Sequence, residues 1–284
     1  MIDKVVIIGS GLMGTGIAQV TGQAGYRVAI VDISTDALNR SKETINKQLT
    51  KLVEKTKLTS EEAESIRGKI VYTTEFKNAV AEADYLIEAV PEDLELKKKI
   101  LLEADSILKP AAIIASNTSQ LSITTLAQAT SRGDRVIGTH WFYPPSIMRL
   151  VEIIVGKETS KATLDATVDF CRKVGKETVV CRDAYGFITS RAISAFVAEC
   201  LRIYEEDVAS IEDIDRAVML GFNHPVGPFR LMDMSGIDTV LHSLEDLSKV
   251  YGERFTPTRT MVQHVKNGTL GQKTGKGFYD YSSH

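Results

Sequence analysis

The chain is short of several residue types, and each shortage excludes a class of protein. It has three cysteines in 284 residues (Cys171, Cys181 and Cys200), an odd number without the spacing of metal ligands, so we expect reduced thiols and no metal site. No run of about 18 apolar residues is present, which predicts the absence of a transmembrane helix. The formal net charge of −3 gives no reason to expect a nucleic acid or a membrane surface as a partner.

What remains is the composition of an ordinary globular protein. Hydrophobic residues make up 43% of the chain and charged residues 25%, and 284 residues can form one large or two ordinary domains. An apolar run starts at Lys4, which leaves no room for a signal peptide before it. Together with the odd number of cysteines, this predicts a cytoplasmic protein.

Short apolar segments alternate with amphipathic or charged segments over the first two thirds of the chain. The segments expected to be strands are residues 4–9, 27–32, 85–89, 112–116, 136–140, 150–155 and 177–180, with 69–71 as a further short strand. The segments expected to be helices are residues 15–24, 35–55, 60–67, 94–108, 124–130 and 161–174. Such alternation is typical of an α/β protein with a doubly wound, mostly parallel sheet of the Rossmann type.

The pattern changes near Cys181, and no strand pattern follows Gly186. The segments with apolar residues at helical spacing are then residues 187–206, 212–220, 238–251 and 257–267. We therefore expect residues 1–182 to form the α/β domain and residues 183–284 to form a smaller, all-helical domain. The helical domain would close a substrate cleft or form a dimer interface.

The most informative motif joins the first predicted strand to the first predicted helix. Residues 9–14 read GSGLMG, which is the G-x-G-x-x-G pattern of a dinucleotide-binding turn. In this pattern Gly9 makes the tight turn, Gly11 lets the backbone approach a pyrophosphate, and Gly14 lets the helix pack closely on the strand. The start of the helix then presents free N–H groups and a positive dipole end to the phosphates.

Asp32 ends the second predicted strand, at the place where a dinucleotide site carries an acid. Its carboxylate can accept hydrogen bonds from both ribose hydroxyl groups of an adenosine, and its charge repels a 2′-phosphate. The next four residues, 33–36, contain no arginine that could bind such a phosphate. The predicted cofactor is therefore NAD rather than NADP.

A single histidine, His140, stands at the end of a predicted strand of the first domain, where open α/β sheets bind their ligands. Glu152 lies inside the apolar run 150–154, and an acid buried there needs a partner. Two adjacent strands could bring Glu152 against the imidazole of His140. The two would then form an acid–base couple in which Glu152 fixes the tautomer and His140 exchanges a substrate proton. The alternative is a buried ion pair with a structural role only.

Two other groups of polar residues allow two interpretations each. Asn117 and Ser119 follow the predicted strand 112–116 and could hold a substrate oxygen or the nicotinamide, or simply belong to a polar loop. The predicted helix 35–55 is rich in lysine, and a lysine-rich face is either solvated or binds a polyphosphate part of the substrate.

With these residues in place, the chain closely resembles the L-3-hydroxyacyl-CoA dehydrogenases over essentially its whole length, especially the short bacterial 3-hydroxybutyryl-CoA type. The resemblance rests on residues 9–14, 115–121, 136–140 with 150–154, 223–231 and 270–281. It implies an NAD-binding domain followed by a helical domain that forms a homodimer. It also implies an enzyme that interconverts an L-3-hydroxyacyl-CoA and the 3-oxoacyl-CoA by hydride transfer with NAD.

The resemblance further implies roles for single residues. His140 would be the catalytic base, Glu152 its orienting partner, and Ser119 a contact of both substrate and cofactor. The residues implied for NAD are Gly9, Gly11, Leu12, Met13, Gly14, Asp32, Glu92, Lys97, Asn117, Ser119 and Lys273, with Glu92 and Lys97 at the nicotinamide ribose. The residues implied for the CoA phosphates are Gln48, Lys51 and Lys55.

Two positions depart from the family's pattern. Tyr143 and Ser190 stand where the family usually has asparagines that line the active site, and position 190 counts among the catalytic groups. Ser190 keeps a hydroxyl group with a shorter reach, whereas Tyr143 adds bulk to the substrate site. Two other interpretations therefore stay open. One is an NAD-dependent dehydrogenase of a 3-hydroxy acid without CoA, and the other is an NAD-binding protein that no longer catalyses.

Overall fold

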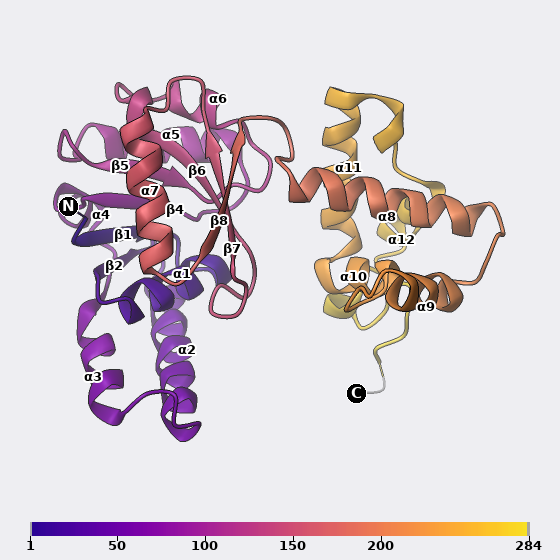
Figure 1. Ribbon diagram of the computed structural model, residues 1–284, viewed down its shortest axis with the longest axis horizontal. Coiled ribbons are helices and arrows are strands. Elements are labelled where there is room, and N and C mark those ends of the chain that lie inside the picture. The colour runs from indigo at the N-terminus through magenta and orange to yellow at the C-terminus, as the bar shows by residue number, and fades with distance from the viewer. Residues whose placement is uncertain (1, 283–284) are drawn as a thin grey trace. The chain divides into compact units, whose positions relative to one another are not determined.

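The computed structural model describes residues 2–282, and the chain divides between Ala184 and Tyr185 into two compact units (Figure 1). The first of these, unit 1, contains an eight-stranded sheet in the order β3-β2-β1-β4-β5-β6-β7-β8. The strands are β1 (Lys4–Ile8), β2 (Arg27–Val31), β3 (Ile70–Thr73), β4 (Tyr85–Glu88), β5 (Ile113–Ser116), β6 (Val136–Trp141), β7 (Leu150–Val155) and β8 (Glu177–Arg182). Every neighbouring pair is parallel except β6 and β7, which are antiparallel. The doubly wound, mostly parallel sheet expected from the sequence is confirmed.

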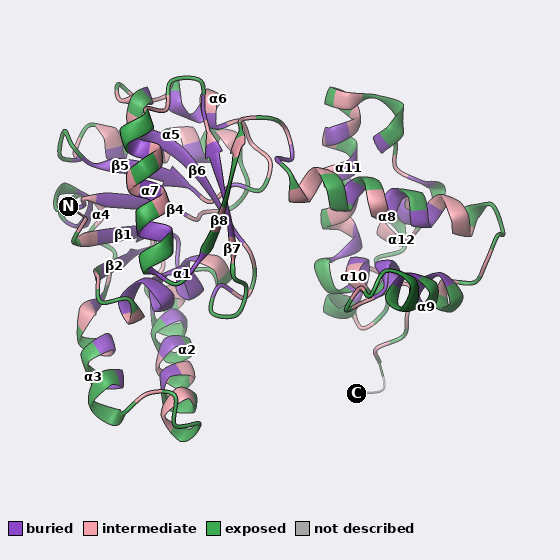
Figure 2. Cartoon of the chain, viewed as in Figure 1, coloured by how far each residue is buried: buried purple, intermediate pink, exposed green. Residues whose placement is uncertain are grey.

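The inner strands of unit 1 are buried because their sequences are almost continuously apolar, as in other parallel sheets that are covered on both faces. β4 and β5 are buried at every position, and β1 at every position after Lys4 (Figure 2). The edge strand β8 is different, since Val179 and Val180 remain 43% and 47% exposed. The sheet therefore has a dry centre, and buried polar side chains there need partners within the protein.

Most helices of unit 1 begin at a side chain that accepts a hydrogen bond from their first free N–H groups. The helices are α1 (Leu12–Gln23), α2 (Thr35–Glu54), α3 (Ser60–Lys69), α4 (Phe76–Ala81), α5 (Leu94–Asp105), α6 (Ile123–Ala127) and α7 (Lys161–Lys173), with a 3₁₀ turn η1 (Gly133–Arg135). Ser34 caps α2, Asp93 caps α5 and Ser160 caps α7. The sequence does not predict α4, because six residues are too few to show a helical period.

The second unit, unit 2, begins at Tyr185. Its helices are α8 (Thr189–Glu205), α9 (Ile211–Gly221), α10 (Pro228–Ser235), α11 (Ile237–Tyr251) and α12 (Arg259–Lys266), with 3₁₀ turns η2 (Glu253–Phe255) and η3 (Gln272–Thr274). The expected helix from Phe187 is wrong at its start, since Phe187 has a φ of 48° and cannot continue a right-handed helix. The sequence also misses α10, because Pro228 suggests a break. It occupies instead the first helical position, where the missing N–H costs nothing. Within residues 2–282, no helix is both long enough and apolar enough to cross a bilayer.

Candidate active site

The loop between β1 and α1 has the shape that its glycines predict. Gly9 has a φ of 100°, and a Cβ at this position would lie 2.6 Å from the backbone oxygen of Ala89. A Cβ at Gly14 would lie 1.9 Å from the backbone oxygen of Gly9, so only glycine lets α1 pack this closely. A Cβ at Gly11, by contrast, would meet no atom within 4 Å. The protein's own atoms do not require glycine at position 11, and the open space beside it fits a ligand's pyrophosphate.

The N-terminus of α1 can receive an anion. Among the helices of eight or more residues in the described part of unit 1, α1 alone lacks a side-chain hydrogen bond at its N-cap, Gly11. No acid stands in its first turn, where Leu12 is exposed and Met13 packs against the core. The first N–H groups and the positive end of the helix dipole therefore suit the phosphates of a dinucleotide.

Asp32 lies beside this loop, just after β2. Its Oδ2 accepts hydrogen bonds from the backbone N–H of Ser10 at 2.8 Å and from the Ser10 hydroxyl at 2.7 Å, and its Oδ1 accepts one from Ser34 N–H at 3.0 Å. Burial opposes ionisation of Asp32, but these hydrogen bonds outweigh it and hold the pKa of the carboxyl below its usual value. A carboxylate accepts about four hydrogen bonds. A ribose that donates two hydroxyl groups to Asp32 therefore has to replace one donor, most simply the rotatable Ser10 hydroxyl.

Replacing Asp32 by asparagine should turn the cofactor preference away from NAD. The variant keeps the size of the side chain but loses the negative charge that we expect to bind the ribose and to repel a 2′-phosphate. We expect the ratio of kcat/KM for NAD to kcat/KM for NADP to fall about 10–100-fold, the value of one charge-assisted hydrogen bond. Steady-state kinetics with both cofactors measures this ratio. Asp36→Asn, in the first turn of α2, is the matched control, and an equal change in both variants would contradict the prediction.

β6 and β7 bring the second predicted pair together. The two strands are antiparallel, and His140 is directly opposite Glu152 in their register, so both side chains lie on one face of the sheet. His140 Nδ1 lies 2.7 Å from Glu152 Oε2. The side chain of Glu152 is 1% exposed and that of His140 is 9% exposed. Water hardly reaches this contact, which strengthens a charge-assisted hydrogen bond. The expected His140–Glu152 pair is present.

The residues around His140 come from the ends of neighbouring strands. Phe142 packs against His140 with ring centroids 4.5 Å apart. Asn117, just after β5, accepts a hydrogen bond from the backbone N–H of Trp141 through its Oδ1 at 3.0 Å. Tyr143 is 60% exposed. Asn117 thus ties the end of β5 to the end of β6, which is a structural contact that the sequence does not predict for it.

Glu92, Lys97 and Ser119, which are all expected to bind NAD, also lie close to one another. Lys97 Nζ is 3.3 Å from Glu92 Oε2, and the Ser119 backbone N–H donates to Glu92 Oε1 at 2.8 Å. Two further residues of this cluster, Glu88 and Ser116, are buried and are not among the predicted site residues. Glu88 has a recognisable signal in the sequence, because it is an acid at the end of an apolar strand, as Glu152 is an acid inside one.

The remaining predicted residues lie on other elements. Gln48 and Lys51 share one face of α2, and Lys55 is its C-cap on the same side. Ser190 is the second residue of α8 in unit 2. Lys273 belongs to η3 of unit 2, where its Nζ binds both carboxylate oxygens of Asp238 at 2.6 and 2.7 Å.

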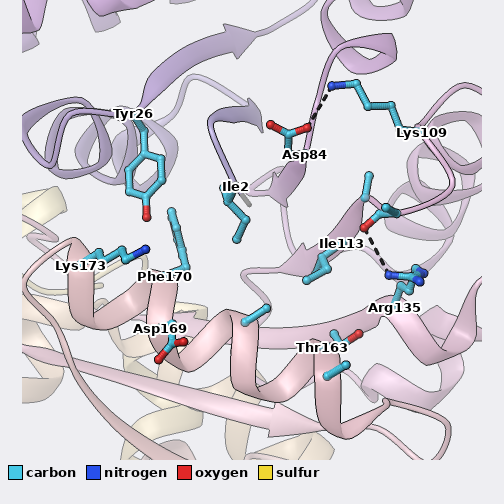
Figure 3. A pocket seen from close by; sticks show the side chains of 14 residues that line it. Ile2, Tyr26, Asp84, Lys109, Ile113, Arg135, Thr163, Asp169, Phe170 and Lys173 are labelled. Atoms are coloured by element: carbon cyan, nitrogen blue, oxygen red, sulfur yellow. Dashed lines mark hydrogen bonds and ion pairs between the residues drawn. The ribbon is translucent and has the colours of Figure 1, made fainter.

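A cavity of about 390 Å³ lies at the amino ends of β1, β4, β5 and β6, opposite to the carboxyl ends where the predicted site residues of the sheet lie. Figure 3 shows Lys109 turned toward Asp84, with Nζ and Oδ1 2.9 Å apart, and Arg135 beside Ile113. Arg135 donates to the backbone oxygen of Ala111 at 3.3 Å. The cavity therefore has partly neutralised charges, and none of the predicted site residues lines it. The candidate chemistry of unit 1 is at the carboxyl ends of the strands instead.

Comparison with known proteins identifies the family. The family model for the NAD-binding domain of 3-hydroxyacyl-CoA dehydrogenase matches residues 4–184, and the model for its C-terminal domain matches residues 186–281. The 3-hydroxybutyryl-CoA dehydrogenase of Bradyrhizobium diazoefficiens is 40% identical over 282 residues, which cover 99% of this chain and 96% of that protein. The mitochondrial hydroxyacyl-coenzyme A dehydrogenase of Rattus norvegicus is 39% identical over 288 residues, which cover 99% and 92%.

A solved structure agrees over the full length. The crystal structure of (S)-3-hydroxybutyryl-CoA dehydrogenase from Ralstonia eutropha matches with a TM-score of 0.96 and 40% identity, covering 100% of both chains. The chain therefore belongs to the 3-hydroxyacyl-CoA dehydrogenase family, enzymes that interconvert 3-hydroxyacyl-CoA and 3-oxoacyl-CoA thioesters with NAD as cofactor.

Proposed function

We propose that this enzyme acts on short-chain L-3-hydroxyacyl-CoA, with 3-hydroxybutyryl-CoA as the model substrate, and that His140 and Glu152 move its proton. The observation that carries the proposal is the 2.7 Å contact between His140 Nδ1 and Glu152 Oε2 in a nearly dry position. The short chain is supported by the bacterial relative that is named for 3-hydroxybutyryl-CoA and aligns over 99% of this chain.

The geometry of the pair indicates which nitrogen of His140 exchanges the proton. Nδ1–H donates to Glu152, so Nε2 is the nitrogen that takes the proton of the 3-hydroxyl group during oxidation. Glu152 then faces an imidazolium and stabilises its charge. NAD, when bound, supplies the acceptor for the hydride that leaves C3 with its two electrons. In the reverse direction the imidazolium returns the proton to the oxygen of the 3-oxo group.

The cofactor and the substrate would be held by the other predicted residues. Ser119 and Ser190 would hold the reacting oxygen or the thioester through their hydroxyl groups, and Tyr143 would limit the space beside Phe142 for the acyl chain. Gln48, Lys51 and Lys55 would face the phosphates of CoA. The preference for a thioester over the free acid should then weaken at high salt, because exposed charge pairs are screened.

The substrate class is tested by NADH oxidation with acetoacetyl-CoA, with longer 3-oxoacyl-CoAs and with free acetoacetate. We expect turnover of acetoacetyl-CoA, a decline with chain length imposed by Tyr143, and at least about 100-fold lower kcat/KM for the free acid, which lacks the CoA contacts. Equal turnover of the free acid would favour a dehydrogenase of a 3-hydroxy acid without CoA. Absence of turnover on every thioester, with NADH still bound, would identify an NAD-binding protein without catalysis.

We also propose that unit 2 forms a homodimer through the C-terminal end of α9. Leu220 and Phe222 are 75% and 73% exposed there. Large apolar side chains that are exposed close together, rather than scattered singly, are typical of an interaction site. Glu212 and Arg216 on the same helix carry opposite charges, so two copies of this surface related by a two-fold axis can form ion pairs with each other. Phe222→Glu should convert a dimer to a monomer in light scattering, whereas Val71→Glu on β3, 57% exposed, should not. A monomeric parent protein would contradict this proposal.

For the location we propose the cytoplasm. Cys171, Cys181 and Cys200 are free thiols, and burial raises the pKa of Cys171 to about 12, which keeps it unreactive. Free thiols are typical of reducing compartments. Recovery of the protein in a membrane or secreted fraction of its cell would contradict the proposal.

A further inference from the structure

A fully buried ion pair lies where β4 ends. Glu88 is the last residue of β4, and Lys97 lies on α5, and the side chains of both are 0% exposed. Lys97 Nζ donates to Glu88 Oε1 at 2.7 Å and to the backbone oxygen of Val90 at 3.2 Å. The mechanism proposed above does not use Glu88.

Glu88 is fixed from three directions. Besides Lys97, its Oε1 accepts a hydrogen bond from Val90 N–H at 2.8 Å, and its Oε2 accepts one from the Ser116 hydroxyl at 2.5 Å. Ser116 is the last residue of the neighbouring strand β5, and Glu88 and Ser116 are partners in the register of the two strands. The carboxylate therefore holds the turn that follows β4, the end of β5 and the ammonium group of Lys97 in one arrangement.

The arrangement leads to Glu92. Lys97 Nζ lies 3.3 Å from Glu92 Oε2, and the side chain of Glu92 is 33% exposed, unlike those of its two charged neighbours. Glu92 Oε1 accepts hydrogen bonds from the Thr118 hydroxyl at 2.5 Å and from Ser119 N–H at 2.8 Å. Glu92 is therefore the accessible end of a chain of contacts that starts at the buried Glu88.

Stability alone does not account for Glu88 and Lys97. A buried ion pair can often be replaced by apolar residues of similar volume without loss of stability, because desolvation of both charges offsets their attraction. A buried charged pair that is fully hydrogen-bonded does, however, fix the positions of the groups around it. Glu92 is the accessible end of this network. A ligand bound at the carboxyl ends of the strands would therefore contact a carboxylate whose position is fixed by the buried pair.

We propose that Glu88 is the positioning residue for the nicotinamide-ribose end of NAD. It holds Lys97 and the turn to Glu92 in place, and it makes the charge of the three-residue cluster −1 in total. This proposal rests on the place of Glu92 at the nicotinamide ribose that the resemblance implies, with the fully buried Lys97 acting through Glu92. NAD⁺ carries a positive nicotinamide ring and NADH does not. A negative cluster at this end of the cofactor therefore favours NAD⁺ over NADH.

The test is binding of three ligands to Glu88→Gln by calorimetry, without substrate. The variant keeps the size of the side chain and removes one negative charge, so NAD⁺ should bind about tenfold more weakly and NADH only about threefold more weakly. ADP lacks the nicotinamide ribose and should bind as before. The control is Glu82→Gln. Glu82 precedes β4 in the chain, and its exposed carboxylate pairs with Lys4, so this variant should leave all three affinities within about twofold.

A second variant decides the matter if Glu88→Gln does not fold. Ser116→Ala keeps both charges and removes one hydrogen bond to Glu88, so it should weaken NAD⁺ about threefold and leave ADP unchanged. The proposal is overturned if the folded variants bind NAD⁺ like the parent protein, or if they lose ADP and NAD⁺ equally. A parent protein that binds NAD⁺ no better than ADP would instead show that Glu92 does not contact the nicotinamide ribose, and this proposal would fail with that contact.

Discussion

Replacing His140 by glutamine is expected to lower kcat at least about 10³-fold in both directions, because glutamine cannot take up or return a proton at neutral pH. The affinity for NADH should stay within about twofold, since His140 lies on β6, whereas Asp32 follows β2 and is held by Ser10 and Ser34. Stopped-flow kinetics with acetoacetyl-CoA and a separate NADH titration measure the two quantities.

Glutamine is a suitable replacement because its amide can still donate to Glu152. Removing one partner of a buried charged pair usually destabilises a protein strongly, and this donor keeps the Glu152 carboxylate from standing alone. His242→Gln, on the exposed side of α11, is the matched control and should leave kcat unchanged. Turnover of His140→Gln at the rate of the control would exclude His140 as the acid–base group.

Most of the fold of unit 1 is predictable from the sequence because nearly all of its elements, the short helix α4 excepted, have a strong local signal. Almost continuously apolar strands such as β1 and β4 alternate with helices that begin at residues such as Ser34 and Asp93, and this pattern leaves few topologies. The signal fails where it depends on backbone conformation. The residues after Phe187 have helical spacing of apolar side chains, but Phe187 itself has a left-handed φ. Pro228 suggests a break in the sequence, whereas in the structure it begins a helix.

The candidate site is predictable where a single residue type is out of place. Glu152 in an apolar run requires a partner, and the register of β6 and β7 supplies His140. Other parts of the site depend on contacts between residues far apart in sequence, such as Ser116 with Glu88 and Thr118 with Glu92. Serine and threonine after a strand look the same in sequence whether they face solvent or a buried carboxylate, so the sequence does not reveal these contacts.

Replacing Glu152 by glutamine is expected to lower kcat about 10²-fold, less than the loss of His140. The amide oxygen can still accept the Nδ1–H of His140 and hold the ring, but the negative charge that stabilises the imidazolium is gone. If Glu152 only orients the ring, the glutamine variant should keep nearly full activity. If its charge also stabilises the imidazolium, kcat should fall even though the fold is intact.

A control variant separates these two roles of Glu152. Glu177 forms an exposed ion pair with Arg149 at the edge strand β8, so Glu177→Gln removes a carboxylate without touching His140 and should leave kcat unchanged. Steady-state kinetics with acetoacetyl-CoA compares the two variants, and circular dichroism checks that both are folded. A Glu152→Gln variant that turns over at the rate of this control would show that the carboxylate does not stabilise the imidazolium and only orients the ring.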